Sequence, residues 1–553
     1  MDKYDKYKIT SVPTTMEEIC YPKDKKFELL PQQKFLAEYL YDNIENLPSK
    51  GLLVYHGIGS GKTCTAIRIA EKFKNNMKIV IVVPASLIGN FKDELRSACG
   101  NYLSNEDRDI IKKLKPTDDE YIKIIDKSDQ EINKYYNIYS YHKFAKDIER
   151  NKLKLNNTLL IIDEIQNMVS ISGSFYKILK SAINKSDDDT KIILLSATPI
   201  FDNPIEISLT LNLLLPKTLF PVDDNFEGTF LSKSGNYYDA KNMDIFKDLC
   251  KGLISYFRGA LPISYPKTNF EVIRCNMSDH QLDIYKIARK KEIMDMRKKK
   301  IKRITFPTNF LIGSRMVSNI AYPNGLSDVE GYESLNIEIS KNTHINMKEY
   351  SCKFIEILDN IKKATGPVFV YSNFLNYGGL KPFIKYLEDN GFKNFNKHNI
   401  GTNRFAIYSG DETLEQRDII KKYYNDYNNI SGEQIKILLG SPSTKEGISL
   451  LRVNQVHILE PHWNFSRIKQ IIGRAIRFCS HKDMPKNERY VNVYLYLATH
   501  PELKLSTDEY IWSIAKKKDV LIKSFETALK EVAIDCELFN KVNNINNKLT
   551  CIM

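Results

Sequence analysis

The chain has 553 residues, 42% hydrophobic and 11% aromatic, which is enough to build sizeable cores and excludes a disordered or fibrous chain. Lys and Arg number 81 against 68 Asp and Glu, and the net charge of +13 indicates either an anionic partner or a generally basic surface. Nine irregularly spaced cysteines without a C-x-x-C pair predict reduced thiols in a cytosol-like compartment and no zinc site.

The first ten residues, MDKYDKYKIT, are charged and do not form the apolar core of a signal peptide. No apolar run approaches the roughly 18 residues that a membrane helix needs. We therefore expect a soluble intracellular protein with no membrane partner.

Short apolar runs alternate with amphipathic stretches in two separate parts of the chain. They predict buried strands at 52–55, 79–83, 159–162 and 192–195, and again at 368–371, 405–408, 435–439 and 456–459. This alternation is typical of parallel α/β layers. We expect an α/β domain at 1–212, a mostly helical linking domain at 213–345, a second α/β domain at 346–500 and a helical tail at 501–553.

The strongest local pattern is GLLVYHGIGSGKTCTAI at 51–67, where a strand, a glycine-rich loop and a helical pattern follow one another. In a phosphate loop of this kind, backbone N–H groups at the start of a helix cradle phosphates. The residues expected to do so are Gly57, Gly59, Ser60 and Gly61, with Lys62 reaching the β- and γ-phosphates and Thr63 binding magnesium. His56 stands where the strict pattern has glycine.

Two adjacent carboxylates, Asp163 and Glu164, follow the apolar run LLII. Such a pair is costly at the end of a buried strand unless it has a cation or a catalytic role. We expect Asp163 to hold magnesium and Glu164 to orient and deprotonate the attacking water, with a solvated strand end as the alternative. Further along, SATPI at 196–200 offers Ser196 and Thr198 as hydrogen-bonding groups after another buried strand.

Near the end of the second α/β set, QIIGRAIRF at 470–478 places Arg474 and Arg477 three residues apart. On a helix this spacing puts both side chains on one face, from which they could stabilise charge on a transferring phosphoryl group. Two solvated helix arginines are the alternative.

Taken in chain order over about 27–480, these segments resemble the motifs of superfamily 2 helicases and translocases. LLPQQ at 29–33 resembles the glutamine motif, with Gln33 as adenine reader, and STKEGISL at 443–450 resembles motif V, with Gly447 as a further nucleotide-binding candidate. VFVYSNF at 368–374 resembles motif IV. The resemblance implies two RecA-like lobes that use ATP and magnesium, with Lys62, Asp163, Glu164, Arg474 and Arg477 as the catalytic set.

The linker sequence at 254–266 and the tail at 508–536 resemble, more narrowly, nucleoside triphosphatase I and the early-transcription-factor helicases of large cytoplasmic DNA viruses of the mimivirus kind. That resemblance implies a nucleic-acid-stimulated ATPase moving along DNA in viral early transcription, in the virion and the host cytoplasm. Viral RNA polymerase or another transcription or nuclease component would be its protein partner. A strand-separating helicase in replication, repair or defence and an ATP-switched binding subunit are the alternatives. Gln166 departs from the family, where His is commoner, and this position couples hydrolysis to motif III.

Nucleic acid, with DNA favoured over RNA, is the expected partner. In the helicase motifs the expected contacts are Ser86, Asn90, Ser140, Tyr141, Ser372, Asn373, Thr444 and Lys445. The segment 286–303, which we call the basic strip, has ten basic and two acidic residues and so carries +8 of the +13, with Lys298, Lys299 and Lys300 at its centre. It predicts a phosphate-tracking helix, with a solvated basic helix as the alternative. Trp463 is interpreted either as a stacking platform or, preferably, as a packed core or interlobe tryptophan.

Overall fold

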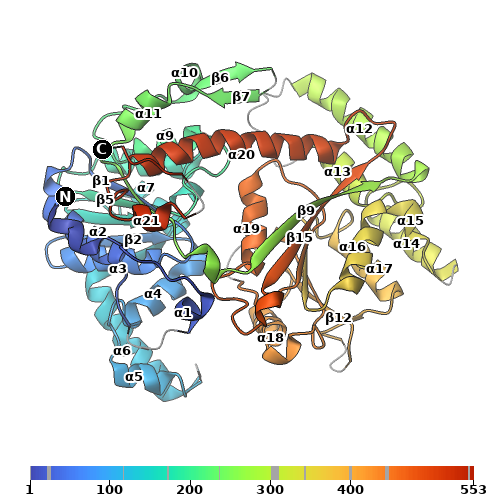
Figure 1. Cartoon of the computed structure of the whole chain (residues 1–553), viewed down its shortest axis with the longest axis horizontal. Helices are drawn as coiled ribbons and strands as arrows, with labels where there is room; N and C mark the ends of the chain where they lie inside the picture. Colours follow the sequence, from blue (N-terminus) through green and yellow to red (C-terminus); the bar gives the residue numbers. More distant parts are fainter. Residues whose placement is uncertain are drawn as a thin grey trace. The chain divides into compact units, whose positions relative to one another are not determined.

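The computed structural model describes residues 2–21, 27–115, 117–170, 173–235, 237–299, 311–341, 344–397, 401–442, 448–545 and 548–552 (Figure 1). The chain forms two compact units. The first unit comprises Met1–Pro262 together with Val520–Met553, and the second comprises Ile263–Asp519. The division therefore falls within one long helix, α20 (Thr507–Glu531).

A six-stranded parallel sheet forms the centre of the first unit. Its strands, in spatial order, are β3 (Tyr136–Ser140), β2 (Lys78–Val83), β4 (Thr158–Ile162), β5 (Lys191–Ser196), β1 (Gly51–His56) and β8 (Ile254–Phe257). All residues of β1, β4 and β5 are buried, as expected for parallel strands covered on both faces. Leu53 and Val80 pack into the core on one face, while Leu52 and Ile79 pack into the core on the other.

Helices cover both faces of this sheet (Figure 1). The helices of this unit are α1 (Met16–Cys20), α2 (Pro31–Asn43), α3 (Lys62–Phe73), α4 (Ile88–Arg96), α5 (Asn105–Ile111), α6 (Asp119–Tyr135), α7 (Tyr141–Glu149), α8 (Ser174–Asn184), α9 (Ile205–Leu211), α10 (Asp223–Phe230), α11 (Met243–Cys250) and α21 (Asn540–Asn543). A small antiparallel hairpin pairs β6 (Leu231–Ser234) with β7 (Tyr237–Ala240).

The second unit contains a seven-stranded parallel sheet. Its spatial order is β11 (Lys393–Asn394), β12 (Arg404–Tyr408), β13 (Ile437–Gly440), β10 (Val368–Tyr371), β14 (Gln455–Ile458), β15 (Tyr490–Thr499) and β9 (Lys267–Asn276). Its helices are α12 (Asp279–Lys299), α13 (Ile312–Asn319), α14 (Val329–Lys341), α15 (Met347–Tyr350), α16 (Cys352–Lys363), α17 (Leu380–Asp389), α18 (Leu414–Tyr424) and α19 (Phe465–Ala475). The first part of α20 also belongs to this unit.

The α/β fold class is confirmed, but the expected linking domain at 213–345 is divided between the two units. Its residues up to Pro262 belong to the first unit and those from Ile263 to the second. It also contains β8 and β9, which form an edge of the first and second sheets respectively. Most side chains of β9 are exposed, so its sequence lacks the apolar pattern of a strand, and pairing along ten residues of β15 holds it instead.

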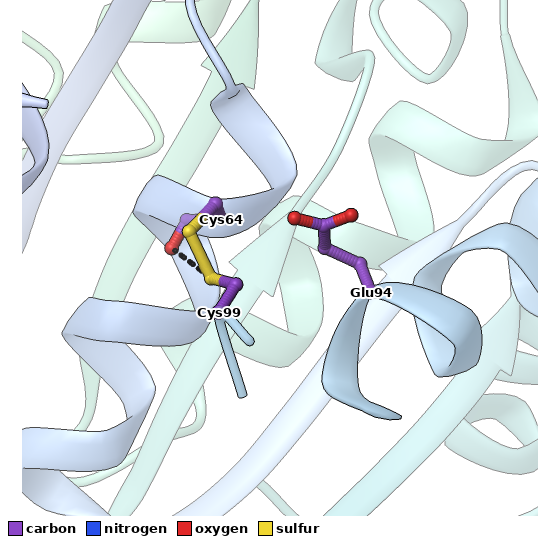
Figure 2. Close-up of side chains that lie close together, drawn as sticks. All are labelled: Cys64, Glu94 and Cys99. Atoms are coloured by element: carbon purple, nitrogen blue, oxygen red, sulfur yellow. Dashed lines mark hydrogen bonds between the residues drawn. A yellow bond between two sulfur atoms is a disulfide. The ribbon is translucent and has the colours of Figure 1, made fainter. Parts of the chain in front are cut away.

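The expectation of reduced thiols is wrong for six of the nine cysteines, because Cys20, Cys64, Cys99, Cys479, Cys536 and Cys551 are disulfide-bonded. Cys64 is bonded to Cys99, and Cys536 to Cys551, with Cα–Cα separations of 5.8 and 5.7 Å. The pairs are 35 and 15 residues apart in the chain, and only folding brings them together, so their spacing gave no signal. Glu94 lies close to the first pair, within 4.8 Å, but its sulfur neighbours are bonded to each other (Figure 2).

Among the described helices, none is both long enough and apolar enough to span a membrane.

Candidate functional site

The glycine-rich loop joins the carboxyl end of β1 to the first turn of α3. Gly59 and Gly61 have φ values of 77° and 71°, in the left-handed region that favours glycine, and Gly61 caps α3. Lys62 and Thr63 are the first two residues of that helix. The loop therefore ends at a helix N-terminus with free backbone N–H groups, which is an arrangement suited to phosphate binding.

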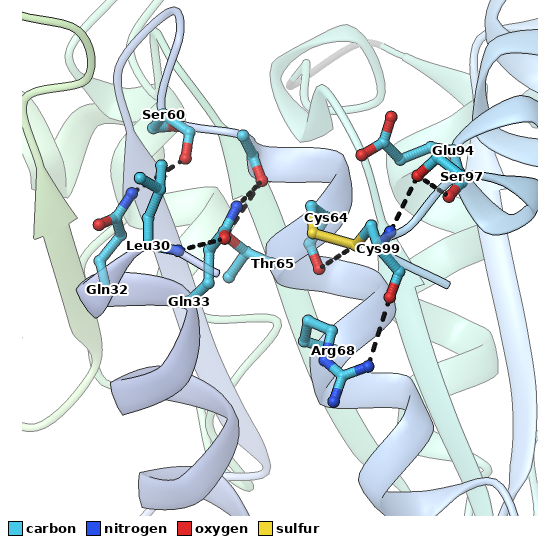
Figure 3. The surroundings of a disulfide bond; sticks show 11 residues. Leu30, Gln32, Gln33, Ser60, Cys64, Thr65, Arg68, Glu94, Ser97 and Cys99 are labelled. Carbon is cyan, nitrogen blue, oxygen red and sulfur yellow. Dashed lines mark hydrogen bonds between the residues drawn. A yellow bond between two sulfur atoms is a disulfide. The ribbon is translucent and has the colours of Figure 1, made fainter. Parts of the chain in front are cut away.

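Two glutamines of α2 hold this loop in place (Figure 3). Gln33 Nε2 donates to the Gly61 carbonyl at 3.2 Å, and Gln32 Nε2 donates to the Ser60 carbonyl at 3.0 Å. The positive φ of Gly61 favours glycine, and a Cβ there would lie 2.5 Å from Gln33 Nε2, so a larger residue would also displace the Gln33 amide. Gln33, expected to read adenine, thus uses its amide to position the loop, and Gln32 is a loop contact that the sequence interpretation missed.

The paired carboxylates follow β4, which lies next to β5, and β5 lies next to β1. Asp163 is buried, and its burial, with the neighbouring Glu164 carboxylate, raises the pKa of Asp163 to about 6. Glu164 has a φ of 49°, in the left-handed region, and its N–H donates to Asp163 Oδ1 at 3.0 Å. Lys62 Nζ lies 3.8 Å from Glu164 Oε1. The lysine of the phosphate loop and the carboxylate pair therefore meet at the carboxyl edge of one sheet.

Gln166 connects this pair to the next strand. Its Nε2 donates to Glu164 Oε2, and its Oε1 accepts a hydrogen bond of 2.7 Å from Ser196 Oγ, at the end of β5. Ser196 Oγ in turn accepts from the Thr198 N–H at 3.0 Å. A continuous chain of polar contacts thus runs from Lys62 to the SATPI segment.

Tyr141, expected to contact nucleic acid, is buried beneath the carboxylate pair. Its hydroxyl donates to the carbonyl of Asp163 at 2.6 Å and lies 3.1 Å from that of Glu164. Ser140 caps α7 by accepting from the Lys143 N–H. Tyr141 therefore supports the site from inside the unit, and its hydroxyl is not available to a phosphate backbone.

In the second unit, Ser372 is also buried and turned inward. Its hydroxyl lies 2.9 Å from Glu460 Oε2, and Asn373 Nδ2 donates to Glu460 Oε1 at 3.0 Å. Glu460 is only 1% exposed and follows β14, as Asp163 follows β4 in the first unit. Glu460 therefore organises the motif-IV segment, a role that a lone acidic residue after an apolar strand could have suggested.

The arginine pair differs from the helical expectation. Arg474 lies in the last turn of α19, which ends at Ala475, so Arg477 is beyond the helix. Arg477 Nη2 donates to the Ile448 carbonyl at 3.4 Å, and burial lowers the pKa of its guanidinium. The two side chains therefore do not share a helical face.

Some of the residues expected to contact nucleic acid or nucleotide are exposed, and others lie outside the described residues. Ser86 and Asn90 are exposed, Asn90 on α4. Gly447, Thr444, Lys445 and Lys300 lie outside the described residues, and for Lys298 and Lys299 only the backbone of α12 is described. Trp463 is confirmed as a packed residue, because it is buried against Ile511 and Ile514.

The basic strip is partly neutralised where its side chains are described. Lys286 Nζ lies 2.6 Å from Glu502 Oε2, and Arg289 Nη1 lies 3.7 Å from Glu292 Oε2. Lys290 and Lys291 are exposed on α12. They are the described part of the strip that remains suited to an anionic partner.

Two parallel α/β units, one with a phosphate loop beside an Asp-Glu pair, define an ATP-hydrolysing enzyme of superfamily 2. The model of the SNF2-related domain matches residues 32–320, and that of the helicase conserved C-terminal domain matches residues 352–479. Each unit is accordingly a RecA-like lobe.

Known proteins of large DNA viruses are similar over nearly the whole chain. A "Putative ATP-dependent RNA helicase" of Acanthamoeba polyphaga mimivirus is 48% identical over 98% of this chain and 94% of its own length. Nucleoside triphosphatase I of Heliothis armigera entomopoxvirus is 27% identical over 92% of this chain and 79% of its own. The chain belongs to the SNF2-related helicases of large DNA viruses.

Proposed function

We propose that the chain is a nucleic-acid-dependent ATPase that converts ATP hydrolysis into movement along nucleic acid. The observation that carries this proposal is the chain of polar contacts from Lys62 through Glu164 and Gln166 to Ser196. It joins the phosphate loop, the carboxylate pair and the SATPI segment. Loss of the γ-phosphate, which Lys62 contacts, can therefore alter the hydrogen bonds of Ser196 at the end of β5. An ATP-switched subunit without turnover would not need Glu164 there.

In this proposal the backbone N–H groups of the loop and Lys62 hold the β- and γ-phosphates. Binding of the γ-phosphate draws Lys62 away from Glu164, which leaves that carboxylate to orient and deprotonate the attacking water. Asp163 fits a magnesium ion, because it is a buried carboxylate beside a second acid, and only its Oδ1 accepts a hydrogen bond from a described residue. Thr63, in the first turn of α3, is the proposed second ligand. When bound, magnesium supplies charge neutralisation for the transferring phosphoryl group.

Arg474 and Arg477 remain the proposed arginines for transition-state charge, and Gly447 remains a proposed nucleotide contact. Arg474→Ala is expected to lower kcat at least a hundredfold with ATP affinity retained, because an arginine of this kind acts on charge that develops in the transition state. A variant with wild-type kcat would remove Arg474 from the catalytic set.

DNA is the proposed substrate, and viral early transcription in the virion and host cytoplasm, with RNA polymerase or another transcription or nuclease component as partner, is the proposed setting. The similarity to nucleoside triphosphatase I supports this choice. The mimivirus relative is named an RNA helicase, so RNA is the competing substrate. Ser86 and Asn90 are proposed backbone contacts, as is the basic strip.

Stimulation of ATP hydrolysis by single-stranded DNA, duplex DNA and RNA, compared at equal nucleotide concentration and fixed salt, tests the proposal. We expect DNA to stimulate turnover and Lys62→Ala to abolish it. Turnover stimulated by RNA alone would replace the DNA assignment, and undiminished turnover in Lys62→Ala would refute the mechanism. Triplex displacement without duplex unwinding would identify a translocase, and efficient unwinding would favour the strand-separating alternative.

A further inference from the structure

The first turn of the phosphate loop rests on a backbone segment from a distant part of the first unit, residues 255–260, which we call the bracing segment. The Gly57 N–H donates to the Phe257 carbonyl at 2.8 Å. A Cβ on residue 57 would lie 2.0 Å from the Arg258 carbonyl oxygen, so the two backbones approach as closely as glycine permits. Any shift of the bracing segment is therefore transmitted directly to the loop.

Residues after α20, near the C-terminal end of the chain, hold the bracing segment. Asp535 Oδ1 accepts from the Tyr256 N–H at 2.8 Å. Asn543 Oδ1 accepts from the Arg258 N–H at 3.0 Å, and its Nδ2 donates to the Tyr256 carbonyl at 3.3 Å. Asp535 and Asn543 are 0% and 1% exposed, so water cannot replace these hydrogen bonds cheaply.

A second connection reaches the residue that directly precedes the loop. Ser255 Oγ donates to Asp535 Oδ2 at 2.6 Å and lies 2.9 Å from His56 Nε2. Because the single hydroxyl proton of Ser255 is given to Asp535, the hydrogen bond with His56 requires the proton on its Nε2. Burial lowers the pKa of His56 to about 3, which keeps the imidazole neutral. His56, which stands where the strict phosphate-loop pattern has glycine, is thus connected to Asp535 through two buried hydrogen bonds with Ser255.

We infer that Asp535, Ser255 and Asn543 are positioning residues for ATP binding, and that the segment 532–545 belongs to the nucleotide-binding device of the first unit. This inference rests on the proposed role of the phosphate loop in holding ATP. It goes beyond that role because it makes nucleotide affinity depend on residues nearly 500 positions away in the chain. The competing view is that the segment 532–545 only stabilises the first unit.

Measuring nucleotide affinity in folded variants distinguishes a positioning role of the segment 532–545 from a purely stabilising one. In full-length protein, Asp535→Ala and Asn543→Ala are expected to raise the dissociation constant of a fluorescent ATP analogue, and KM for ATP, about tenfold. Nucleic-acid affinity without nucleotide stays unchanged. Glu537→Gln, an exposed residue of the same segment, is the matched control and keeps wild-type values.

Asp535→Asn is the conservative variant, because an amide can keep both hydrogen bonds. Its Oδ1 accepts from the Tyr256 N–H, and its Nδ2 donates to Ser255 Oγ, whose proton then passes to the His56 ring. The ring carries its own proton on Nδ1 in that arrangement. Nucleotide affinity within about threefold of wild type is expected for this variant.

Thermal unfolding and circular dichroism establish whether each variant is folded. Wild-type nucleotide affinity in a folded Asp535→Ala or Asn543→Ala protein would overturn the inference. If Asp535→Ala does not fold, Asn543→Ala and Ser255→Ala decide by the same criterion. Lys62→Ala, measured in parallel, separates this inference from the proposed function. If Lys62→Ala also binds ATP with wild-type affinity, the loop does not hold ATP and the proposed function fails. If Lys62→Ala loses ATP affinity and the positioning variants do not, only this inference fails.

Discussion

Replacing Gln166 by alanine tests whether the chain of polar contacts supports catalysis. The side chain donates to Glu164 Oε2 and accepts from Ser196 Oγ, and Gln166→Ala removes both hydrogen bonds. A lost bond to a charged group in a half-buried site costs about 1.5–3 kcal/mol, part of which relaxation and water recover. We therefore expect kcat to fall roughly ten- to thirtyfold, since about 1.4 kcal/mol corresponds to tenfold.

Steady-state ATP hydrolysis, with and without saturating nucleic acid, measures this effect. KM for ATP should change little, because Lys62 and the loop are untouched, and stimulation by nucleic acid should fall with kcat. Gln166→His is expected to retain most activity, since one ring nitrogen can donate to Glu164 and the other accept from Ser196. Asn167→Ala, at an exposed neighbouring position, is the control. Undiminished kcat in Gln166→Ala would refute the reasoning.

Three further outcomes follow from the packing and charge of the two units. Lys353 Nζ lies 2.6 Å from a carboxylate oxygen of Asp508, and both side chains are 0% exposed. Lys353→Met leaves the Asp508 charge buried without its partner and is expected to lower the free energy of unfolding of the second unit, measured in urea, by ~3–5 kcal/mol. A double variant that removes both charges should lose less. Burial raises the pKa of Asp535 to about 7, so the unfolded chain loses this proton first and the carboxyl destabilises the fold as pH rises from about 4 to 7. The unfolding free energy of Asp535→Asn, relative to that of the wild type, should therefore increase between about pH 4 and 7 and then level off, and a constant difference would contradict the shift. Lys290→Gln with Lys291→Gln should weaken nucleic-acid binding and its salt dependence while basal ATPase stays intact, and unchanged affinity would make the basic strip a solvated helix.

The strands that could be predicted from the sequence are those buried on both faces of a sheet, because they appear as continuous apolar runs. The run 368–371 coincides with β10, and 52–55 lies within β1, because parallel strands covered on both faces are continuously apolar. The phosphate loop and the Asp163–Glu164 pair were predictable for a related reason: polar residues at the ends of such strands are few and have a definite chemical use.

The features that the sequence did not predict depend on strand pairing and on contacts between residues far apart in the chain. Strand β9 is held by its neighbour and not by its own apolar residues. Tyr141 and Ser372 have the polarity of surface residues, yet their hydroxyls serve the interior. Asp535 lies in a stretch that reads as a helical tail, and only the fold brings its carboxylate to the strand beside the phosphate loop.

The role of Glu164 in ATP hydrolysis is tested most directly by comparing nucleotide binding with turnover in the wild type and in Glu164→Gln. We predict that the wild type hydrolyses ATP and is stimulated by nucleic acid. Glu164→Gln should bind ATP with near wild-type affinity and hydrolyse it at least about a hundredfold more slowly, because the amide cannot accept the proton of the attacking water. Wild-type turnover in Glu164→Gln would contradict the mechanism.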